Sequence, residues 1–597
     1  MVCYTSIFIE DEKGNNMIKV ENLSYGYPQK ELYDTVSFHI IEGQHCAFIG
    51  LSGSGKSSMI DMILDPEEYM YTGKLTISPN TRIAYVSQFY RLEKGNTQTV
   101  FEYIAEEFIQ KQALIDDLCV ELGCTDNIEL TLERYQEALD SFEAIDGNNY
   151  ESNIAKQLQL ANLTLQRNLP VADLSGGEFK LVQVIREMLV KPDLLIMDEP
   201  DVFLDFENVN ALCDLINTHK GTLLVVTHNR YLLNHCFNKI IHLEDKMIQE
   251  FDGTYIDYNF SLLANKVELQ ELALADTQEI ERNNVIIDNL RLRASYDADA
   301  ARGRALGARV KIQERLMARR IKEPFLYIKQ PKIQLVTQNP ISETTAITVE
   351  DYTVSFDDLL LEHVSFEIGS NEKVAIIGPN GTGKTTLLRA IYQNQNPAIH
   401  IDAQIETAYL SQNQGEMLTE SNTIFDEFFH IGFETYDQIR EYLVDYGFEG
   451  EVLEQRISTL SGGEKNILQL AKISTTNANL LLLDEPTSHL DTYTQLGLEQ
   501  AIQNYNGAIL MVSHDFYTIA NCVDYVIIIA DQTIRKMKLK KFKQMIYAKH
   551  FSKDYLLLEE KKKTIEMQIE EHLKVNEFPP AQKLCEELEE IIKQMQA

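Results

Sequence analysis

The sequence predicts an α/β chain with two copies of one phosphate-loop (P-loop) domain in tandem, joined by an α-helical hairpin linker. Three observations predict it. Five short motifs occur twice in the same order, and apolar runs such as LLIMD and AILMVS are typical of buried strands. Glycine-rich turns directly precede runs with helical spacing. We also expect a helical arm inserted in the first copy and a helical C-terminal extension.

The internal repeat sets the expected domain boundaries. AFIGLSGSGKSSM (47–59) matches AIIGPNGTGKTTL (375–387). In both copies a Ser-Gly-Gly segment lies 23 residues before an Asp-Glu pair, and a His follows that Asp by 30 residues. Matching order and spacing over five motifs indicate a duplicated domain. The expected parts are an N-terminal tail (1–16), a first domain (17–250) with its arm (about 100–165), a linker (251–330), a second domain (346–545) and the extension (546–597).

Composition excludes several classes of protein. The 597 residues are 44% hydrophobic, so sizeable cores are expected and wholesale disorder is excluded. The net charge of −37 argues against binding to nucleic acid or anionic membranes. No apolar run is long enough for a membrane span, and the first residues do not resemble a secretory signal. Eight scattered cysteines without a C-x-x-C pair indicate reduced thiols in a cytoplasm and no zinc site.

Two glycine-rich loops fit the pattern G-x-x-x-x-G-K-[ST]. In such a loop backbone N–H groups point at phosphate oxygens, the Lys reaches the β- and γ-phosphates, and the last hydroxyl binds Mg²⁺. A glycine-rich turn without ligand is the alternative, which two matches in register disfavour. The residues expected to bind ATP here are Gly50, Ser52, Gly53, Ser54, Gly55, Lys56, Ser57 and Ser58, and Gly378, Asn380, Gly381, Thr382, Gly383, Lys384, Thr385 and Thr386.

An Asp-Glu pair ends an apolar strand in each copy. A carboxylate at that place can hold Mg²⁺ directly or through water, which predicts this role for Asp198 and Asp484. The glutamates that follow, Glu199 and Glu485, are placed to polarise an attacking water. A lone His at a strand end is more often a core residue, but the repeated spacing favours catalysis. The two histidines are His228 and His514.

These motifs, with LSGGE at 174–178 and 460–464, resemble the ABC ATPases, whose signature is LSGGE. The resemblance implies two domains that meet head to tail and hold two ATP molecules, each between one P-loop and the other domain's signature. It implies that Gln88 and Gln412 are catalytic and bind Mg²⁺, and that adenine stacks on Tyr27 and Phe356, although either aromatic could be core packing. Site one would join Lys56, Ser57, Gln88, Asp198, Glu199 and His228 to Ser461, Gly462 and Gly463; site two would join Lys384, Thr385, Gln412, Asp484, Glu485 and His514 to Ser175, Gly176 and Gly177.

One segment departs from the family's pattern. The second copy reads DEPTSHLD (484–491), close to the usual sequence, whereas the first reads DEPDVFLD (198–205). Val202 and Phe203 thus stand where Ser488 and His489 stand in the second copy. This segment crosses between domains in the superfamily, so we expect site one to hydrolyse ATP more slowly than site two.

The linker contains a positively charged segment, whereas the rest of the chain is acidic. A first helix with an apolar stripe is expected to end near RASYDADA, and a second to run from about 300 to 322. Residues 291–322 hold ten Lys or Arg and three acids, a local charge of +7. A solvated spacer is the alternative. The candidate RNA contacts are Arg291, Arg293, Arg304, Lys311, Arg315 and Lys322.

The whole arrangement resembles the ABC-F family. That resemblance implies a cytoplasmic protein that enters the ribosome at the tRNA exit site and directs its linker toward P-site tRNA, ribosomal RNA and the peptidyl-transferase centre. Members are translation factors or antibiotic-resistance ribosomal protection proteins. The alternative is an ATP-hydrolysing subunit of a membrane transporter.

Both chain ends leave interpretations open. Two helices are expected over 556–575 and 581–595, separated by NEFPP. They form either a coiled-coil hairpin, as in some family members, or a clamp on the second domain. Whether translation starts at Met1 or Met17 stays open.

Overall fold

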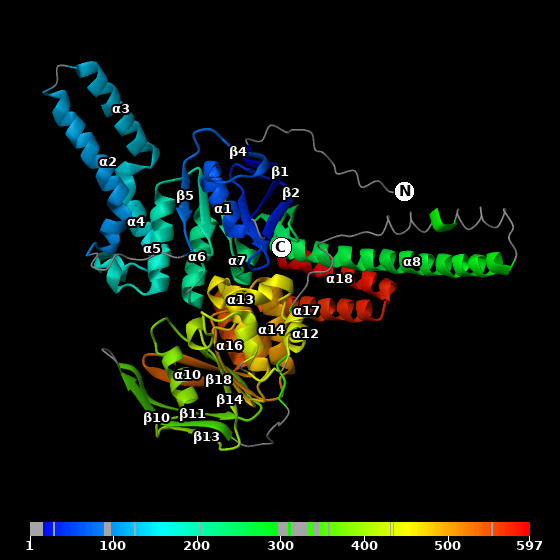
Figure 1. Ribbon diagram of the computed structural model, residues 1–597. Helices are drawn as coiled ribbons and strands as arrows, with labels where there is room; N and C mark the ends of the chain where they lie inside the picture. Colours follow the sequence, from blue (N-terminus) through cyan, green and yellow to red (C-terminus); the bar gives the residue numbers. More distant parts are fainter. Residues whose placement is uncertain are drawn as a thin grey trace. The chain divides into compact units, whose positions relative to one another are not determined.

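The computed structural model describes residues 16–27, 30–88, 97–124, 127–202, 204–296, 309–311, 331–337, 345–355, 359–429, 431–433, 435–550 and 553–596 (Figure 1). The chain divides into two compact units. The first comprises Met1–Thr254 and Lys329–Lys543, and the second Tyr255–Ile328 and Gln544–Ala597. The first unit contains both copies of the repeat, which confirms the tandem α/β architecture.

The first copy is built on a six-stranded sheet of order β5-β6-β7-β3-β8-β9. Its first five strands run parallel, and β9 is antiparallel to β8. The apolar runs are buried because helices cover a parallel sheet on both faces. The strands are β3 (His45–Gly50), β5 (Ile83–Val86), β6 (Leu194–Asp198), β7 (Thr222–Val226), β8 (Lys239–Glu244) and β9 (Met247–Asp252), and a second, antiparallel sheet holds β1 (Asn16–Tyr27), β2 (Lys30–Ile41) and β4 (Thr72–Ile77).

The second copy repeats this topology, with strand order β14-β15-β16-β12-β17-β18 and a smaller sheet β11-β10-β13. In both copies a single strand separates the P-loop strand from the strand that ends at the Asp-Glu pair, so the motifs meet at one edge of the sheet. The strands are β10 (Thr345–Ser355), β11 (Leu359–Gly369), β12 (Lys373–Ile377), β13 (Ile399–Ile401), β14 (Thr407–Leu410), β15 (Leu480–Asp484), β16 (Ala508–Val512), β17 (Tyr525–Ala530) and β18 (Thr533–Lys538).

A helical insertion follows β5 in the first copy, where an arm was expected. The helix α2 begins with a capping box in which the Thr99 hydroxyl and the Glu102 carboxylate satisfy each other's backbone N–H. Figure 1 shows α2 and α3 side by side, extending away from the sheet. The insertion comprises α2 (Val100–Leu122), α3 (Ile128–Ala144) and α4 (Tyr150–Leu160).

The remaining helices of the first unit follow the motifs. Two of them begin at a P-loop Lys and two at a signature glycine. They are α1 (Lys56–Leu64), α5 (Gly176–Leu189), α6 (Phe206–Thr218), α7 (Arg230–His235), α10 (Lys384–Gln393), α11 (Ile424–Phe429), α12 (Tyr436–Val444), α13 (Gly462–Ser474), α14 (Thr492–Asn504) and α15 (Phe516–Cys522), and α16 (Leu539–His550) spans the boundary of the units.

The second unit is a helical bundle. The first linker helix, α8 (Tyr255–Tyr296), packs with α17 (Lys553–Lys574) and α18 (Phe578–Gln596). Val267, on the predicted apolar stripe of α8, is buried in their shared core. The C-terminal helices therefore use the linker as a partner, which neither sequence interpretation named. Of the second helix expected over 300–322, only residues 309–311 are described, and they are helical.

Candidate functional site

Both P-loops hold their lysine against the loop itself. Gly55, with φ of 109°, ends the first loop, and α1 begins at the next residue. The Lys56 ammonium donates to the carbonyl oxygens of Gly50 and Leu51 at 3.0 and 2.9 Å. Lys384 makes the equivalent pair at 2.8 and 2.7 Å. Burial lowers the pKa of both lysines. Each ammonium is thus held by two carbonyl oxygens of its own loop. A bound phosphate would compete with these neutral groups for the ammonium.

A hydroxyl and a carboxylate meet beside each loop. The Thr385 hydroxyl donates to Asp484 Oδ1 at 3.1 Å, and in the first copy Ser57 is near enough to Asp198 to lower the pKa of that carboxyl in part. Burial raises the pKa of both aspartates to about 6. Asp198 Oδ1 is buried without a hydrogen-bond partner among the described residues. Oxygen donors of these two kinds fit Mg²⁺.

The signature segments act as helix caps. Ser175 and Ser461 are the N-caps of α5 and α13, and each forms a capping box with the glutamate three residues later. The free N–H groups of a helix N-terminus suit an anion. This capping role was not among the sequence predictions, although the Ser-x-x-Glu spacing before an apolar run is its recognised signal.

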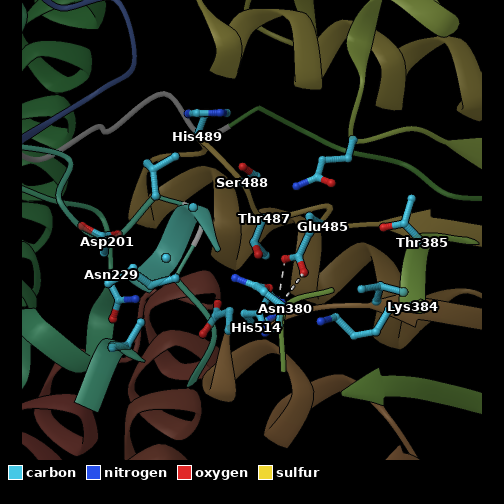
Figure 2. Close-up of a pocket in the computed structure, with 18 of the residues that line it drawn as sticks. Asp201, Asn229, Asn380, Lys384, Thr385, Glu485, Thr487, Ser488, His489 and His514 are labelled. Atoms are coloured by element: carbon cyan, nitrogen blue, oxygen red, sulfur yellow. Dashed lines mark hydrogen bonds and ion pairs between the residues drawn. The ribbon is translucent and has the colours of Figure 1, made fainter. Parts of the chain in front are cut away.

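One cavity of about 690 Å³ brings most of site two together. Figure 2 shows Asp201 and Asn229 of the first copy on one side, and Lys384 and Thr385 of the second on the other. Asp484 is linked to this cavity through its bond with Thr385. The predicted site-two residues that line the cavity are Lys384, Thr385, Gln412, Glu485, His514, Ser175, Gly176 and Gly177, joined by Asn380, Gly381, Gly383 and Thr386 of the same P-loop.

At site one the P-loop contacts the other copy directly. The Ser52 hydroxyl of the first P-loop donates to the carbonyl oxygen of His489 in the second copy at 3.0 Å. A Cβ atom on Gly463 would lie 2.6 Å from both the Ser52 Oγ and that carbonyl. At site two the P-loop also contacts the other copy, because the Asn380 backbone N–H donates to Asp205 Oδ2 at 3.2 Å. Each P-loop therefore touches the segment that follows the Asp-Glu pair of the other copy.

The strand-end glutamates share a strained backbone but differ in environment. Glu199 and Glu485 have φ of 45° and 49°, a region that costs a side chain about 1 kcal/mol or more. Burial raises the pKa of Glu199, but His489, His228 and Lys56 outweigh it, so the pKa lies below its ordinary value. Burial raises the pKa of Glu485, and the neighbouring Asp484 adds to this.

Different partners cause that difference. Gln88 Nε2 donates to Glu199 Oε2, and His489 Nδ1 of the second copy lies 3.6 Å from the same oxygen. Glu485 instead lies 3.3 Å from His514 Nε2 of its own copy. Burial lowers the pKa of His514 to about 3, so this imidazole is neutral.

The segment DEPDVFLD (198–205), which departs from the family's pattern, lies at site two and not at site one. Val202 lines the cavity that contains Lys384 and Glu485, and Phe203 lies outside the described residues. The segment of the second copy faces site one, through His489. The expected slower hydrolysis at site one followed from the loss of polar groups in this segment and did not assign the segment to either site. The structure places each segment at the other copy's site.

His228 lines the same cavity and is buried. Neither ring nitrogen has a hydrogen-bond partner among the described residues. Burial, with Lys56 nearby, lowers its pKa, so the ring is neutral near pH 7. It can then donate or accept one hydrogen bond to a ligand in the cavity.

A buried arginine joins the two copies beside this cavity. Arg230 Nη2 donates to Glu499 Oε1 at 2.5 Å and to Asp515 Oδ2 at 2.7 Å. The guanidinium also lies over the ring of Tyr517, 5.1 Å from its centroid. The internal repeat does not give a second cluster of this kind. Cys213 stands at the position that corresponds to Glu499, and Phe516 stands at the position that corresponds to Arg230. These residues were not among the sequence predictions, because no local motif distinguishes them.

Only some of the adenine and RNA-contact candidates are among the described residues. Tyr27 is half exposed, and its hydroxyl lies 3.4 Å from Ser58 Oγ beside the first P-loop. Arg291 is exposed on α8, 3.4 Å from Asp288, and Lys311 is exposed. Arg293 lies on α8, but its side chain is not described. The candidates outside the described residues are Phe356, Arg304, Arg315 and Lys322.

Comparison with known proteins agrees with these motifs. The family model described as ABC transporter matches residues 33–202 and 361–488. The uncharacterized ABC transporter ATP-binding protein YfmM of Bacillus subtilis is 30% identical over 528 residues, covering 84% of this chain and 96% of that protein. ABC transporter F family member 2 of Arabidopsis thaliana is 30% identical over 534 residues, covering 86% and 76%. The chain belongs to the ABC-F family of ABC ATPases.

The fold of this ABC-F protein is shared with solved tandem ATPases. One solved structure, of ribosome-bound archaeal Pelota and ABCE1, contains a chain that superposes with a TM-score of 0.51 at 16% identity, covering 89% of this chain and 80% of that one. At that identity the likeness concerns the fold. Among the described residues, the ABC-F protein has no helix with the length and hydropathy of a membrane span.

Proposed function

We propose that this ABC-F protein hydrolyses ATP at two sites between its nucleotide-binding domains. One observation carries the proposal. A single cavity is lined by the P-loop Lys384 of one domain and by the signature residues Ser175 to Gly177 of the other. A γ-phosphate between them would meet an ammonium group and the N-terminus of α5 together. ATP would then hold the two domains as an intramolecular dimer, and hydrolysis would release them.

The residues around the phosphates have separate tasks in this proposal. The P-loop lysine exchanges loop carbonyls for phosphate oxygens. Glu199 and Glu485 accept a proton from the attacking water, and a neutral histidine at each site orients the γ-phosphate. Asp198 with Ser57, and Asp484 with Thr385, would hold Mg²⁺ with the help of Gln88 and Gln412. The bound ion supplies positive charge to the phosphate oxygens.

We propose further that the protein acts on the ribosome. Family membership supports this, as does the +7 charge of residues 291–322 in an otherwise acidic chain. The α8 helix has 42 residues and therefore spans about 60 Å, so it carries exposed Arg291 far from the start of the linker. The linker would enter from the tRNA exit site and contact ribosomal RNA and P-site tRNA near the peptidyl-transferase centre. Its effect would be that of a translation factor or of an antibiotic-resistance protein.

A hydrolysis-deficient variant tests both proposals. Glu199→Gln with Glu485→Gln should lose ATP hydrolysis while it still binds ATP, and should co-sediment with ribosomes when ATP is present. Lys56→Ala with Lys384→Ala is the matched control, which should neither bind ATP nor be retained. Recovery of the first variant with a membrane complex instead of ribosomes would favour the transporter alternative. Drug susceptibility with and without the gene separates resistance from general translation.

A further inference from the structure

His489 of the second domain occupies an unusual position at site one. Its backbone has φ of 60°, a left-handed conformation for a residue with a side chain. Its ring packs on Gly462, where a Cβ would lie 3.2 Å from the ring atoms, and its carbonyl accepts the hydroxyl of Ser52 from the first domain. One residue therefore touches the signature of its own domain and the P-loop of the other.

The ring also faces the glutamate expected to activate water. His489 Nδ1 lies 3.6 Å from Glu199 Oε2, while Gln88 Nε2 donates to the same oxygen. The side chains are only 18% and 19% exposed, so water competes little for this contact. Glu199 is held from both domains, by Gln88 in its own and by His489 in the other. Its carboxylate thus has fewer orientations than one held from a single domain.

The second site lacks the equivalent partner. The repeat places Phe203 at the position of His489, and a phenyl ring has no nitrogen to offer a carboxylate. Val202, the neighbour of that residue, lines the cavity where Glu485 lies, and Glu199 and His489 border the same cavity. Among the described residues, the ion-pair contact of Glu485 is with His514, from its own domain.

We propose that His489 is a positioning residue supplied by one domain to the glutamate of the other, and that site one is therefore the faster of two unequal ATPase sites. The inference rests on the proposed ATP hydrolysis and reverses the order expected from the sequence. Because the contact crosses between domains, Glu199 is fully positioned only while the domains are together. Hydrolysis at site one is then coupled to closure, whereas no described residue of the first domain makes such a contact with Glu485.

Single-turnover hydrolysis of bound ATP by the full chain tests the inference. In a Glu485→Gln background, only site one can turn over. There, His489→Phe, which copies the first domain's residue, should slow hydrolysis about 10- to 100-fold, the cost of a misplaced catalytic group. The affinity for ATP should stay within about twofold, because a positioning role affects the rate rather than binding. His489→Asn should recover much of the rate, since its amide can donate to the same carboxylate.

The reciprocal change tests the asymmetry. In a Glu199→Gln background, where only site two can turn over, Phe203→His should speed hydrolysis. A rate for His489→Phe within twofold of its background would overturn the inference, as would weakened ATP binding at an unchanged rate. If His489→Phe does not fold, His489→Ala is measured against the same two outcomes. Absence of hydrolysis by the unmodified chain would instead refute the proposed function.

Discussion

Arg230 provides the sharpest test of how the two nucleotide-binding domains are held together. Its side chain is only 10% exposed, and its partners Glu499 and Asp515 belong to the other domain. Replacement by Met keeps most of the volume but removes the charge. Two carboxylates would then remain at the interface without their cation. We therefore expect Arg230→Met to weaken the pairing of the domains strongly.

The expected magnitude follows from the contacts. Removing one partner of a buried ion pair costs about 3–5 kcal/mol. Thr518 and Asn521 still donate to Glu499, at 3.1 and 2.8 Å, which offsets part of the loss and favours the lower figure. For domains of about 200 residues, about 3 kcal/mol corresponds to a fall of roughly 6–12 °C in the unfolding midpoint.

Calorimetric unfolding of the full chain measures this effect. Arg82→Met is the matched control, because Arg82 pairs with Asp193 at 3.4 Å inside one domain and both side chains are nearly half exposed. Such a surface pair contributes about 0–1 kcal/mol. A midpoint for Arg230→Met no lower than that of Arg82→Met would refute the reasoning. Arg230→Lys, which keeps the charge but loses the planar fork, should fall between the two.

Three further predictions concern other parts of the chain. Burial raises the pKa of Glu244 to about 8, so the folded chain retains a proton that the unfolded chain releases above about pH 4.5, and stability falls as pH rises between these values. The melting temperature of Glu244→Gln should therefore exceed that of the wild type by an amount that grows from pH 5 to pH 8. A difference that stays constant over this range would contradict the reasoning. Gly463→Ala should destabilise by about 1–3 kcal/mol because its Cβ would meet atoms at 2.6 Å. Gly176→Ala is the control, since a Cβ there would have no described atom within 4 Å, and equal melting temperatures would contradict the close contact at Gly463. Val267→Asp buries a charge in the bundle of α8, α17 and α18, so the melting temperature measured by circular dichroism should fall. Val285→Asp, at a 61% exposed position of the same helix, is the control. Equal effects of the two substitutions would refute the shared core.

The sequence predicted the parts of the fold that depend on neighbouring residues. A P-loop is a strand, a turn and a helix in succession, so its glycines and Lys56 mark all three. The LSGGE segments likewise mark the starts of α5 and α13. The linker stripe also predicted the buried face of α8 correctly at Val267, but not the C-terminal helices that cover it. Apolar stripes show that a face is buried without naming its partner.

The sequence by itself determined the duplicated α/β architecture and the residue types at each strand end, because these follow from local order and spacing. It also located the departure in the DEPDVFLD segment. Only the tertiary structure decided which P-loop that segment lies beside. Glu199 and His489 are 290 positions apart in the chain, and their contact depends on how two domains pack. The same holds for Arg230 and Glu499, since pairing between distant residues is set by the surfaces that meet and not by any repeat in the sequence.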